Sequence, residues 1–303
     1  MIVITVGKSY IDIDGYASSI AYRELLGMKG IESKFVSNAV LNYSITYSLK
    51  SIPYSVDDYW IDSNDKYIIL DLSNKSFFPE FVDENNIVEI IDHHPEFEDY
   101  WNNKLGDNAI IEPIGSVATI IIERYEQEGL LDRMDKDVAK LLMAAILDNT
   151  LNFTANITTS RDRIAYKKLE SLINEYDYAS TYFSECQKYI EDNLQESIKN
   201  DMKVQRINKC LPEVFGQLTI WDAKELLHKR DFINQIMNGY GNKWMLNIIS
   251  LSNNSSYIIY SNDEIKSKLE QLLDCYDKNG TLIKSPAMLR KEIMSKALKA
   301  KSK

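Results

Sequence analysis

The first half of the chain alternates short apolar runs with longer stretches of helical periodicity. Apolar runs at residues 2–6, 33–37, 66–73 and 86–92 each predict a strand. Between and after them, stretches such as YASSIAYRELLGMKG and DKDVAKLLMAAIL place apolar residues at helical spacing. Strands that alternate with helices form parallel sheets. The sequence therefore predicts an α/β domain in which a parallel sheet is flanked by helices.

The second half of the chain has a different pattern. Two long helical stretches follow Thr159, and beyond Lys203 three apolar runs, QLTIW, WMLNIISLS and SSYIIYS, predict strands. Further helices are predicted near residues 264–273 and 286–299. This order predicts a second, smaller α+β domain, with residues 1–190 in the first domain and residues 191–303 in the second.

Composition narrows the class of protein. The chain has 303 residues, enough for two domains, and no apolar run long enough to cross a bilayer. Its first residues lack the features of a secretory signal, and its three cysteines show no metal-binding or disulfide spacing, so we expect a reducing cytoplasm. The net charge of −10 argues against nucleic acid as a partner. An anionic substrate is still compatible with this charge if a divalent metal inverts the local field.

Side chains with metal-binding chemistry follow three of the predicted strands. They are Asp12 and Asp14 after the first strand, Asp71 at the end of YIILD, and Asp92, His93 and His94 at the end of VEIIDHH. In an open parallel sheet, ligand sites form beyond the carboxyl ends of the strands. Several carboxylates there would repel one another without a counter-ion, and oxygen ligands with one or two imidazoles suit Mn²⁺ or Mg²⁺. The sequence therefore predicts a metal site, in which two ions sharing a carboxylate would clamp a phosphoryl group.

A structural role is the alternative for each of these residues alone, because aspartates after strands often cap helices or form turns. The occurrence of such groups at three strand ends, in order, favours the metal site. One imidazole of the DHH run would then bind metal, and its neighbour would face the substrate.

At these residues the sequence resembles the DHH phosphoesterase superfamily. The similarity runs through five motifs in order, DIDGYAS, LDLS, IDHH, EPIGSVATIIIERY and AAILDNTLNFTANITTSRD. The resemblance implies a set of metal ligands, namely Asp12, Asp14, Asp71 and His93. It also implies that Asp71 bridges two ions, that His94 contacts phosphate, and that Asp92 orients an imidazole.

Two motifs in the second half point to one branch of that superfamily. NDMKVQ resembles the D-x-K segment of the family II manganese-dependent inorganic pyrophosphatases and related exopolyphosphatases, whose second domain is named DHHA2, and MLRKEIM resembles their terminal S-R-K-K-Q motif. The resemblance implies that Lys203, Arg290 and Lys291 clamp phosphoryl oxygens, with the active site in the cleft between the two domains. For Arg290 and Lys291 the alternative is a solvated face of the last helix. The Gly-Gly-Gly-His segment of the oligonucleotide-cleaving branch is absent from the sequence.

Two positions in the first half depart from the family pattern. Lys8 stands where the family has a histidine. Its ammonium cannot bind metal and could instead lie near Asp12, which implies one fewer firmly held ion. In the run ILDNT the family's ligand aspartate falls on Asn149, and Asp148 becomes the ligand if the end of the helix shifts by one residue.

The terminal motif departs as well, since Leu289 and Glu292 replace a serine and a lysine of the family. A clamp with less positive charge argues against an efficient pyrophosphatase. It leaves room for a longer polyphosphate or a phosphorylated metabolite as the substrate.

We therefore expect a cytoplasmic, metal-dependent hydrolase that cleaves phosphoric anhydride bonds of the pyrophosphate or polyphosphate type with metal-activated water. The expected partners are Mn²⁺ or Mg²⁺ and a small anionic phosphate substrate, without nucleic acid or membrane, and a homodimer is left open. Two alternatives stay open. One is a phosphodiesterase acting on short oligonucleotides or nucleotides, and the other is a catalytically degenerate DHH protein that binds phosphate or a partner.

Overall fold

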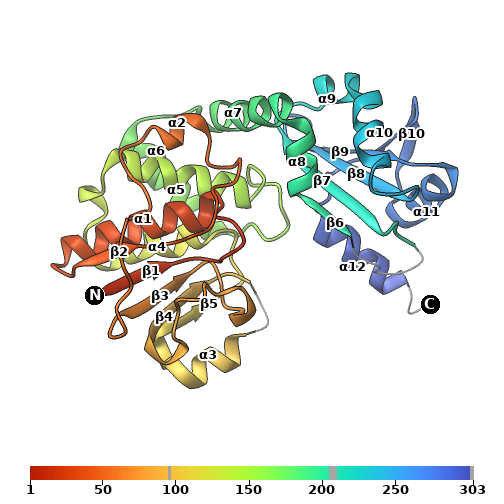
Figure 1. Ribbon diagram of the computed structural model, residues 1–303. Helices are drawn as coiled ribbons and strands as arrows, with labels where there is room; N and C mark the ends of the chain where they lie inside the picture. The colour runs from red at the N-terminus through yellow and green to blue at the C-terminus, as the bar shows by residue number, and fades with distance from the viewer. Residues whose placement is uncertain (95–96, 205–209, 301–303) are drawn as a thin grey trace. The chain divides into compact units, whose positions relative to one another are not determined.

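The chain divides into two compact units, Met1–Ala179 and Ser180–Lys303 (Figure 1). A computed structural model describes residues 1–94, 97–204 and 210–300, and within the last range the side chain of Lys291 lies outside the described part.

The first unit is built on a parallel sheet. Its strands lie in the order β2-β1-β3-β4-β5, and each pair of neighbours is parallel. The strands are β1 Ile2–Thr5, β2 Ser33–Phe35, β3 Lys66–Leu70, β4 Ile87–Asp92 and β5 Ala109–Ile111. Strands β1 to β4 coincide with the predicted apolar runs, which confirms the predicted α/β domain.

Helices cover both faces of this sheet (Figure 1). They are α1 Ile13–Met28, α2 Tyr47–Lys50, α3 Glu98–Leu105, α4 Val117–Gln127, α5 Lys136–Asn149 and α6 Ser160–Ile173. On one face the buried Trp101 of α3 packs with Val3, Ile69 and Ile90. On the other face α1 and α4 contact the strands, and α5 packs on α1, α4 and α6. Burial of these apolar faces stabilises the unit by about 25 cal/mol per Å² of area removed from water.

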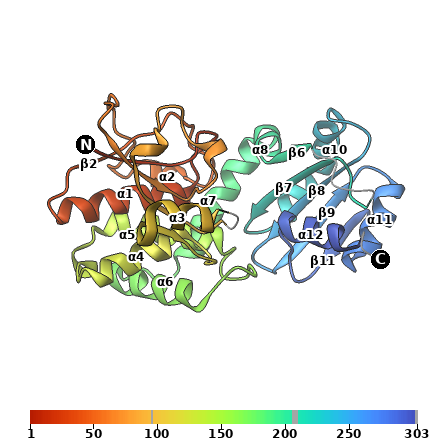
Figure 2. The ribbon, with the colours of Figure 1, turned by 90° about the horizontal axis from the view of Figure 1, so that it is seen from below.

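The second unit contains a mixed six-stranded sheet in the order β10-β11-β9-β8-β7-β6, in which β7 and β8 run parallel and the other pairs antiparallel. Its strands are β6 Met202–Val204, β7 Val214–Ile220, β8 Trp244–Ser250, β9 Ser255–Tyr260, β10 Tyr276–Lys278 and β11 Thr281–Lys284. The helices of this half are α7 Tyr178–Asp192, α8 Leu194–Asn200, α9 Lys224–His228, α10 Arg230–Asn238, α11 Asp263–Leu273 and α12 Arg290–Ala300. The last two cover one face of the sheet (Figure 2), where Leu269 and Ile293 pack with Phe215 and Met245. This is the predicted α+β architecture.

The units divide at 179/180, whereas the sequence predicts a boundary at 190/191. The difference is helix α7. Phe183 stacks on Trp221 with ring planes 14° apart, and the Gln187 side chain accepts a hydrogen bond from the Asp222 N–H group. A helix belongs to the unit on which it buries its apolar side, and periodicity alone does not reveal which unit that is.

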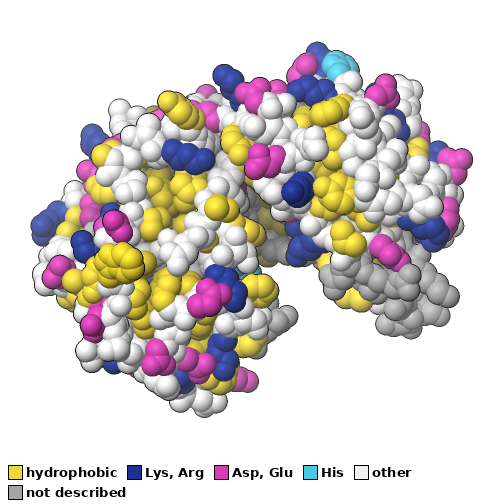
Figure 3. Space-filling model, viewed as in Figure 1, with side chains coloured by type: hydrophobic (Ala, Val, Ile, Leu, Met, Phe, Trp, Pro, Cys, Tyr) yellow, Lys and Arg dark blue, Asp and Glu magenta, His cyan; other side chains and the backbone are white. Residues whose placement is uncertain are grey.

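The visible surface carries charges of both signs. On the face shown in Figure 3, acidic and basic side chains are interspersed rather than gathered into large areas of one sign. None of the helices in the described ranges combines the length and the apolar character that a membrane span requires.

Candidate metal centre

Several of the predicted site residues lie at one edge of the sheet of the first unit. Asp12 precedes α1, Asp71 follows β3, and His93 and His94 follow β4, which ends at Asp92. Because β1, β3 and β4 are parallel neighbours, their carboxyl ends lie side by side.

Asp71, His93 and His94 bring three potential ligand atoms within 4.8 Å of one another. His93 Nε2 lies 3.4 Å from Asp71 Oδ1, and His94 Nδ1 lies 3.9 Å from the same oxygen. Asp71 adopts a left-handed backbone conformation with φ of 58°, which is uncommon for residues other than glycine. The end of β3 therefore takes a conformation of higher energy, in which this carboxylate reaches the two histidines.

The Asp71 carboxylate is buried without a full set of hydrogen bonds. Its side chain is 11% exposed, and Oδ1 accepts no hydrogen bond from the described residues. Burial, together with the carboxylates of Asp12 and Asp14, raises the pKa of Asp71 well above its usual range. A buried acceptor without a partner costs about 1–3 kcal/mol. A cation at this point would remove both that cost and the repulsion between the carboxylates.

Each imidazole is held through its Nδ1 atom. His93 Nδ1 lies 3.0 Å from the carbonyl oxygen of Ile114. Because a carbonyl oxygen only accepts hydrogen bonds, Nδ1 carries the proton, and Nε2, which faces Asp71, keeps its lone pair in the neutral ring. His94 Nδ1 lies 2.8 Å from Asp92 Oδ1, and that oxygen also accepts the backbone N–H groups of His93 and His94 at 2.7 and 3.1 Å.

Asp92 and His94 stabilise each other's charged forms. Burial works toward a higher pKa for Asp92, but the hydrogen bond and charge of His94 hold it below the usual value. Partial loss of hydration works against a charge on His94, yet the Asp92 hydrogen bond and the Asp71 carboxylate raise the pKa of His94 above its ordinary value. The His94 side chain is 61% exposed, so its ring is accessible to a ligand in solution.

Asp12 and Gly15 border the same space as Asp71. Asp12 caps α1, and its Oδ1 accepts a hydrogen bond from the Gly15 N–H group at 3.1 Å. A Cβ atom added to Gly15 would lie 3.6 Å from both Asp12 Oδ1 and Asp71 Oδ2. The two carboxylates therefore face a gap that glycine at this position leaves open.

Asp14, in the first turn of α1, is fully buried against the start of α4. Its oxygens accept four hydrogen bonds, from Ser116 Oγ at 2.8 Å, Val117 N at 2.9 Å, Ala118 N at 3.0 Å and Ser18 Oγ at 3.3 Å. A carboxylate at a helix N-terminus satisfies free N–H groups and complements the helix dipole. The structure thus makes Asp14 the anchor of α4. Its role as a metal ligand stays a prediction.

These residues fit a divalent cation. Asp71 Oδ1 accepts no hydrogen bond from the part of the chain that the structure describes, the lone pair of His93 Nε2 faces it, and the gap beside Gly15 is bordered by two carboxylates. Carboxylate oxygens and an imidazole nitrogen form the ligand set expected for Mn²⁺, and the cluster contains no thiolate.

Lys8 does not lie where the sequence suggested. The expectation placed its ammonium near Asp12, whereas Lys8 Nζ lies 3.4 Å from Glu80 Oε1, and both of these side chains are exposed. The physical reason is solvation, because an ammonium group loses less hydration beside a surface carboxylate than inside a buried site.

Asp148 and Asn149 form the last turn of α5. The Asn149 amide donates to the carbonyl oxygen of Ala145 at 3.5 Å, so it is turned toward its own helix. The cluster of ligand atoms found within the described ranges does not include Asp148. Its predicted role as a ligand stays a prediction.

In the second unit, Arg290 forms an ion pair with Asp201. Its Nη2 lies 2.7 Å from Asp201 Oδ1, its side chain is 16% exposed, and its backbone N–H group donates to Gln217 Oε1 at 2.6 Å. Burial raises the pKa of Asp201 although Arg290 works against this shift. Arg290 is therefore not on a solvated helix face. Lys203 is exposed on β6, and the side chain of Lys291 lies outside the described residues.

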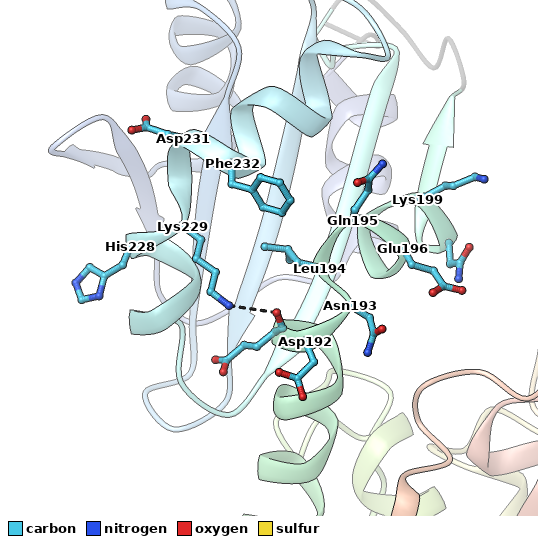
Figure 4. A pocket seen from close by; sticks show the side chains of 12 residues that line it. Asp192, Asn193, Leu194, Gln195, Glu196, Lys199, His228, Lys229, Asp231 and Phe232 are labelled. Atoms are coloured by element: carbon cyan, nitrogen blue, oxygen red, sulfur yellow. Dashed lines mark hydrogen bonds between the residues drawn. The ribbon is translucent and has the colours of Figure 1, made fainter.

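A pocket of about 980 Å³ in the second unit is separate from these groups (Figure 4). Carboxylates, two lysines, His228 and Phe232 line it, and Lys229 Nζ donates to the carbonyl oxygen of Glu191 at 3.1 Å. Its acids and bases are mixed, and within the described chain they do not form a cluster of ligand atoms like that at Asp71. We assign it no chemistry.

Ile114, Ser116 and Asp162 were not among the predicted site residues, although each makes a contact at or beside the site. Asp162 Oδ2 accepts the Gly115 N–H group at 3.1 Å, and Asp162 forms a capping box with Thr159. Two motifs in the sequence could have indicated these contacts. In EPIGSVATIIIERY a Gly-Ser pair precedes helix α4, and in TTSRD a Thr-x-x-Asp pair begins helix α6.

The chain is similar to known proteins in both sequence and fold. Residues 2–146 match the DHH family, N-terminal domain. The chain is 28% identical over 254 residues to the manganese-dependent inorganic pyrophosphatase of Methanothrix thermoacetophila, covering 76% of this chain and 74% of that protein. It is 25% identical over 233 residues to a Shouchella clausii protein assigned as a manganese-dependent inorganic pyrophosphatase, covering 75% and 73%. The crystal structure of a Methanococcus jannaschii protein assigned as a family II inorganic pyrophosphatase shares the fold, with a TM-score of 0.68 and 19% identity over 100% of both chains.

Proposed function

We propose that the chain, whose residues 2–146 match the DHH family, N-terminal domain, is a Mn²⁺-dependent phosphohydrolase that cleaves phosphoric anhydride bonds. The observation that carries this proposal is the position of His93 Nε2, 3.4 Å from the unpartnered Oδ1 of the buried Asp71. A carboxylate oxygen and an imidazole nitrogen this close together can both coordinate the same divalent ion. The relatives named as manganese-dependent inorganic pyrophosphatases support the metal and the class of reaction.

Asp71 and His93 would hold the ion, and Asp12, Asp14 and Asp148 are the further proposed ligands. Bound Mn²⁺ would act as a Lewis acid on a phosphoryl oxygen and favour ionisation of the attacking water. The chain's own contribution is orientation. Hydrogen bonds from both imidazoles to fixed oxygen atoms hold the rings in place before any ligand arrives.

His94 would contact the phosphoryl group. Its ring is accessible, and Asp92 anchors it through Nδ1, so in the protonated ring the Nε2–H group would donate to an oxygen on which negative charge develops. Asp92 is a positioning residue in this account. Lys203, Arg290 and Lys291 are the further proposed phosphoryl-binding residues, supported by the sequence motifs in which they occur.

The preferred substrate would be tripolyphosphate, a longer polyphosphate or a phosphorylated metabolite rather than pyrophosphate. Pyrophosphate concentrates its charge in the smallest volume and needs the most positive charge around it. Here Lys8 pairs with Glu80, and Asp201 neutralises Arg290. Both pairs reduce the positive charge available for a dense anion.

A binding protein without turnover is the second candidate. The observation that favours it is the side chain of Asn149, whose amide is engaged by its own helix at the position of a family ligand. Such a protein would keep metal affinity through Asp71 and His93 but would hydrolyse none of the substrates below.

A panel of substrates tests the proposal. Pyrophosphate, tripolyphosphate, long-chain polyphosphate, a dinucleotide and a nitrophenyl phosphodiester are incubated with the native protein, with Mn²⁺ and with Mg²⁺, and phosphate or nitrophenol release is measured. We expect Mn²⁺-dependent release from tripolyphosphate that Asp71→Asn abolishes and that the exposed control Asp107→Asn retains. Turnover confined to the dinucleotide would point to the phosphodiesterase. No turnover in the native protein, with activity in Lys8→His, would favour the binding protein.

A further inference from the structure

We propose that Asp162, a carboxylate outside the ligand cluster, is a positioning residue that fixes the His93 ring through the backbone of Gly115 and Ile114. This inference rests on the proposed function, because it assumes that His93 Nε2 binds the metal. Asp162 lies in the first turn of α6, far along the chain from His93.

Asp162 does more than cap its own helix. It is fully buried and accepts hydrogen bonds from the Thr159 N–H and hydroxyl groups at 2.7 and 2.8 Å, which form the cap. It also accepts the Gly115 N–H group at 3.1 Å and the Thr119 hydroxyl at 2.7 Å, across 47 and 43 residues. A helix cap explains the first two bonds only. The other two attach α6 to the segment that precedes and opens α4.

The backbone of Gly115 is closely packed at the point where it binds Asp162. A Cβ atom on Gly115 would lie 2.7 Å from Asp162 Oδ2 and 2.7 Å from Thr150 Cγ2, both closer than real Cβ contacts. The carboxylate of Asp162 and the residue that follows α5 therefore both pack closely against the Cα atom of Gly115. Its position is set by Asp162 and Thr150 together.

The residue before Gly115 holds the imidazole. The Ile114 carbonyl oxygen accepts the His93 Nδ1–H group at 3.0 Å, and the Ile114 N–H group donates to Glu112 O at 2.8 Å. One peptide unit thus joins the hydrogen bond at Asp162 to the hydrogen bond at His93. The carbonyl fixes the tautomer that leaves the Nε2 lone pair facing Asp71.

Replacing Asp162 with asparagine removes an acceptor where four donors converge. Three of these donors, the Gly115 N–H group and the two Thr159 groups, meet at Oδ2, while the Thr119 hydroxyl binds Oδ1 and can turn to accept from an amide. A neutral amide oxygen accepts hydrogen bonds more weakly than a carboxylate, and the Gly115 bond, at 3.1 Å, is the longest of the three at Oδ2, so we expect it to weaken most. Ile114 would then shift, and the Nδ1–H tautomer of His93 would lose its acceptor.

Thr119→Val is the matched control. Valine has nearly the same shape and removes a hydroxyl that also binds Asp162 inside the same buried cluster. It leaves the bond from Gly115 to Asp162 intact. If Asp162 had a purely structural role, Asp162→Asn and Thr119→Val would have the same effect on the His93 tautomer and on Mn²⁺ affinity. If Asp162 positions His93, only Asp162→Asn would change them.

Nitrogen-15 NMR of the histidine rings in the metal-free protein reads the tautomer directly, and the chain has only three histidines to assign. We expect the Nδ1–H form of His93 in the native protein and in Thr119→Val, and a mixture of tautomers in Asp162→Asn. In a calorimetric titration with MnCl₂, Asp162→Asn should bind about 10- to 100-fold more weakly than Thr119→Val.

The inference is overturned if Asp162→Asn keeps the Nδ1–H tautomer and binds Mn²⁺ as tightly as Thr119→Val. If Asp162→Asn does not fold, Asp162→Glu replaces it. Glutamate keeps the acceptor but lengthens the arm by one methylene, so a smaller change in the same direction is expected, and no change contradicts the inference. A native protein that shows the Nδ1–H tautomer and binds no Mn²⁺ would contradict the proposed function instead, and the tautomer in Asp162→Asn would still decide this inference.

Discussion

His93 Nε2 lies 3.4 Å from Asp71 Oδ1, although the two residues follow different strands and are held by unrelated groups. Asp71 reaches this position through a left-handed backbone, and His93 through a hydrogen bond to Ile114. The backbone of Asp71 and the hydrogen bond of His93 thus act independently to bring a ligand oxygen and a ligand nitrogen together. We expect such an arrangement where a metal ion is bound.

Gly15→Ala should weaken Mn²⁺ binding without unfolding the protein. The new methyl group would lie 3.6 Å from one oxygen each of Asp12 and Asp71, in the gap between the two carboxylates, and 3.1 Å from Val6 Cγ1. Alanine is favoured over glycine in a helix by about 1 kcal/mol, which offsets the tight contact with Val6. We expect an affinity loss of at least about 10-fold by calorimetry, as for other changes beside a metal ligand.

The control for this variant is Gly27→Ala, in the same helix, where nothing lies within 4 Å of the added methyl group. It should raise the free energy of unfolding by about 0.5–1 kcal/mol and leave the Mn²⁺ affinity unchanged. Equal Mn²⁺ affinities in the two variants would show that the gap beside Gly15 is not part of the site.

Gly115→Ala should destabilise the first unit strongly. Its methyl group would meet Asp162 Oδ2 and Thr150 Cγ2, each at 2.7 Å, and both neighbours belong to buried structure. Forcing a methyl group into a packed site costs about 1–3 kcal/mol, so we expect the upper part of that range in urea unfolding. A loss below about 0.5 kcal/mol, the level of an ordinary surface change, would mean that Gly115 and Asp162 are not in firm contact.

Arg124→Met should cost about 3 kcal/mol of unfolding free energy, because it leaves a buried carboxylate without its cation. Arg124 Nη2 lies 2.5 Å from Glu89 Oε1, Glu89 is 11% exposed at its side chain, and Tyr22 donates to the other Glu89 oxygen at 2.6 Å. Lys29→Met, which removes an exposed ion pair with Glu128, serves as the comparison and should cost less than about 1 kcal/mol. Similar losses in the two variants would contradict the burial argument.

Glu84 should contribute stability that depends on pH. Hydrogen bonds from Lys104 and Tyr100, with Lys75 nearby, lower the pKa of Glu84 to about 2 from its ordinary value of 4.5. A depressed pKa stabilises the folded state fully above the unfolded value, and this stability is lost as the pH falls toward the folded value. The difference in unfolding free energy between the native protein and Glu84→Gln should therefore be smaller at pH 3 than at pH 6. A difference that is unchanged or larger at pH 3 would argue against this shift.

Much of the first unit could be predicted from the sequence, because its strands are buried on both faces and appear as apolar runs that end in polar residues. The approach of Asp71 to the two histidines follows from the same rule, since parallel strands align their carboxyl ends. Helix α3 was not predicted, although its Trp101 fills one face of the sheet. Its eight residues are mostly polar, and a single buried tryptophan produces no periodic pattern.

Contacts between distant segments could not be predicted. The pairing of Lys8 with Glu80 joins residues 72 apart, and the bond from Gly115 to Asp162 joins residues 47 apart. The motifs marked both regions as important, but spacing along the chain does not tell which carboxylate faces a metal and which anchors a helix. Asp14 shows the difficulty, since its place in a ligand motif coincides with four hydrogen bonds at α4.

A calorimetric titration of the metal-free protein with MnCl₂, repeated for Asp71→Asn and for the exposed control Asp107→Asn, tests the central claim most directly. We predict binding in the native protein and in the control, and at least about 100-fold weaker binding in Asp71→Asn, because a neutral amide replaces the carboxylate that faces both histidines. Equal Mn²⁺ affinity in all three proteins would contradict the assignment of this site.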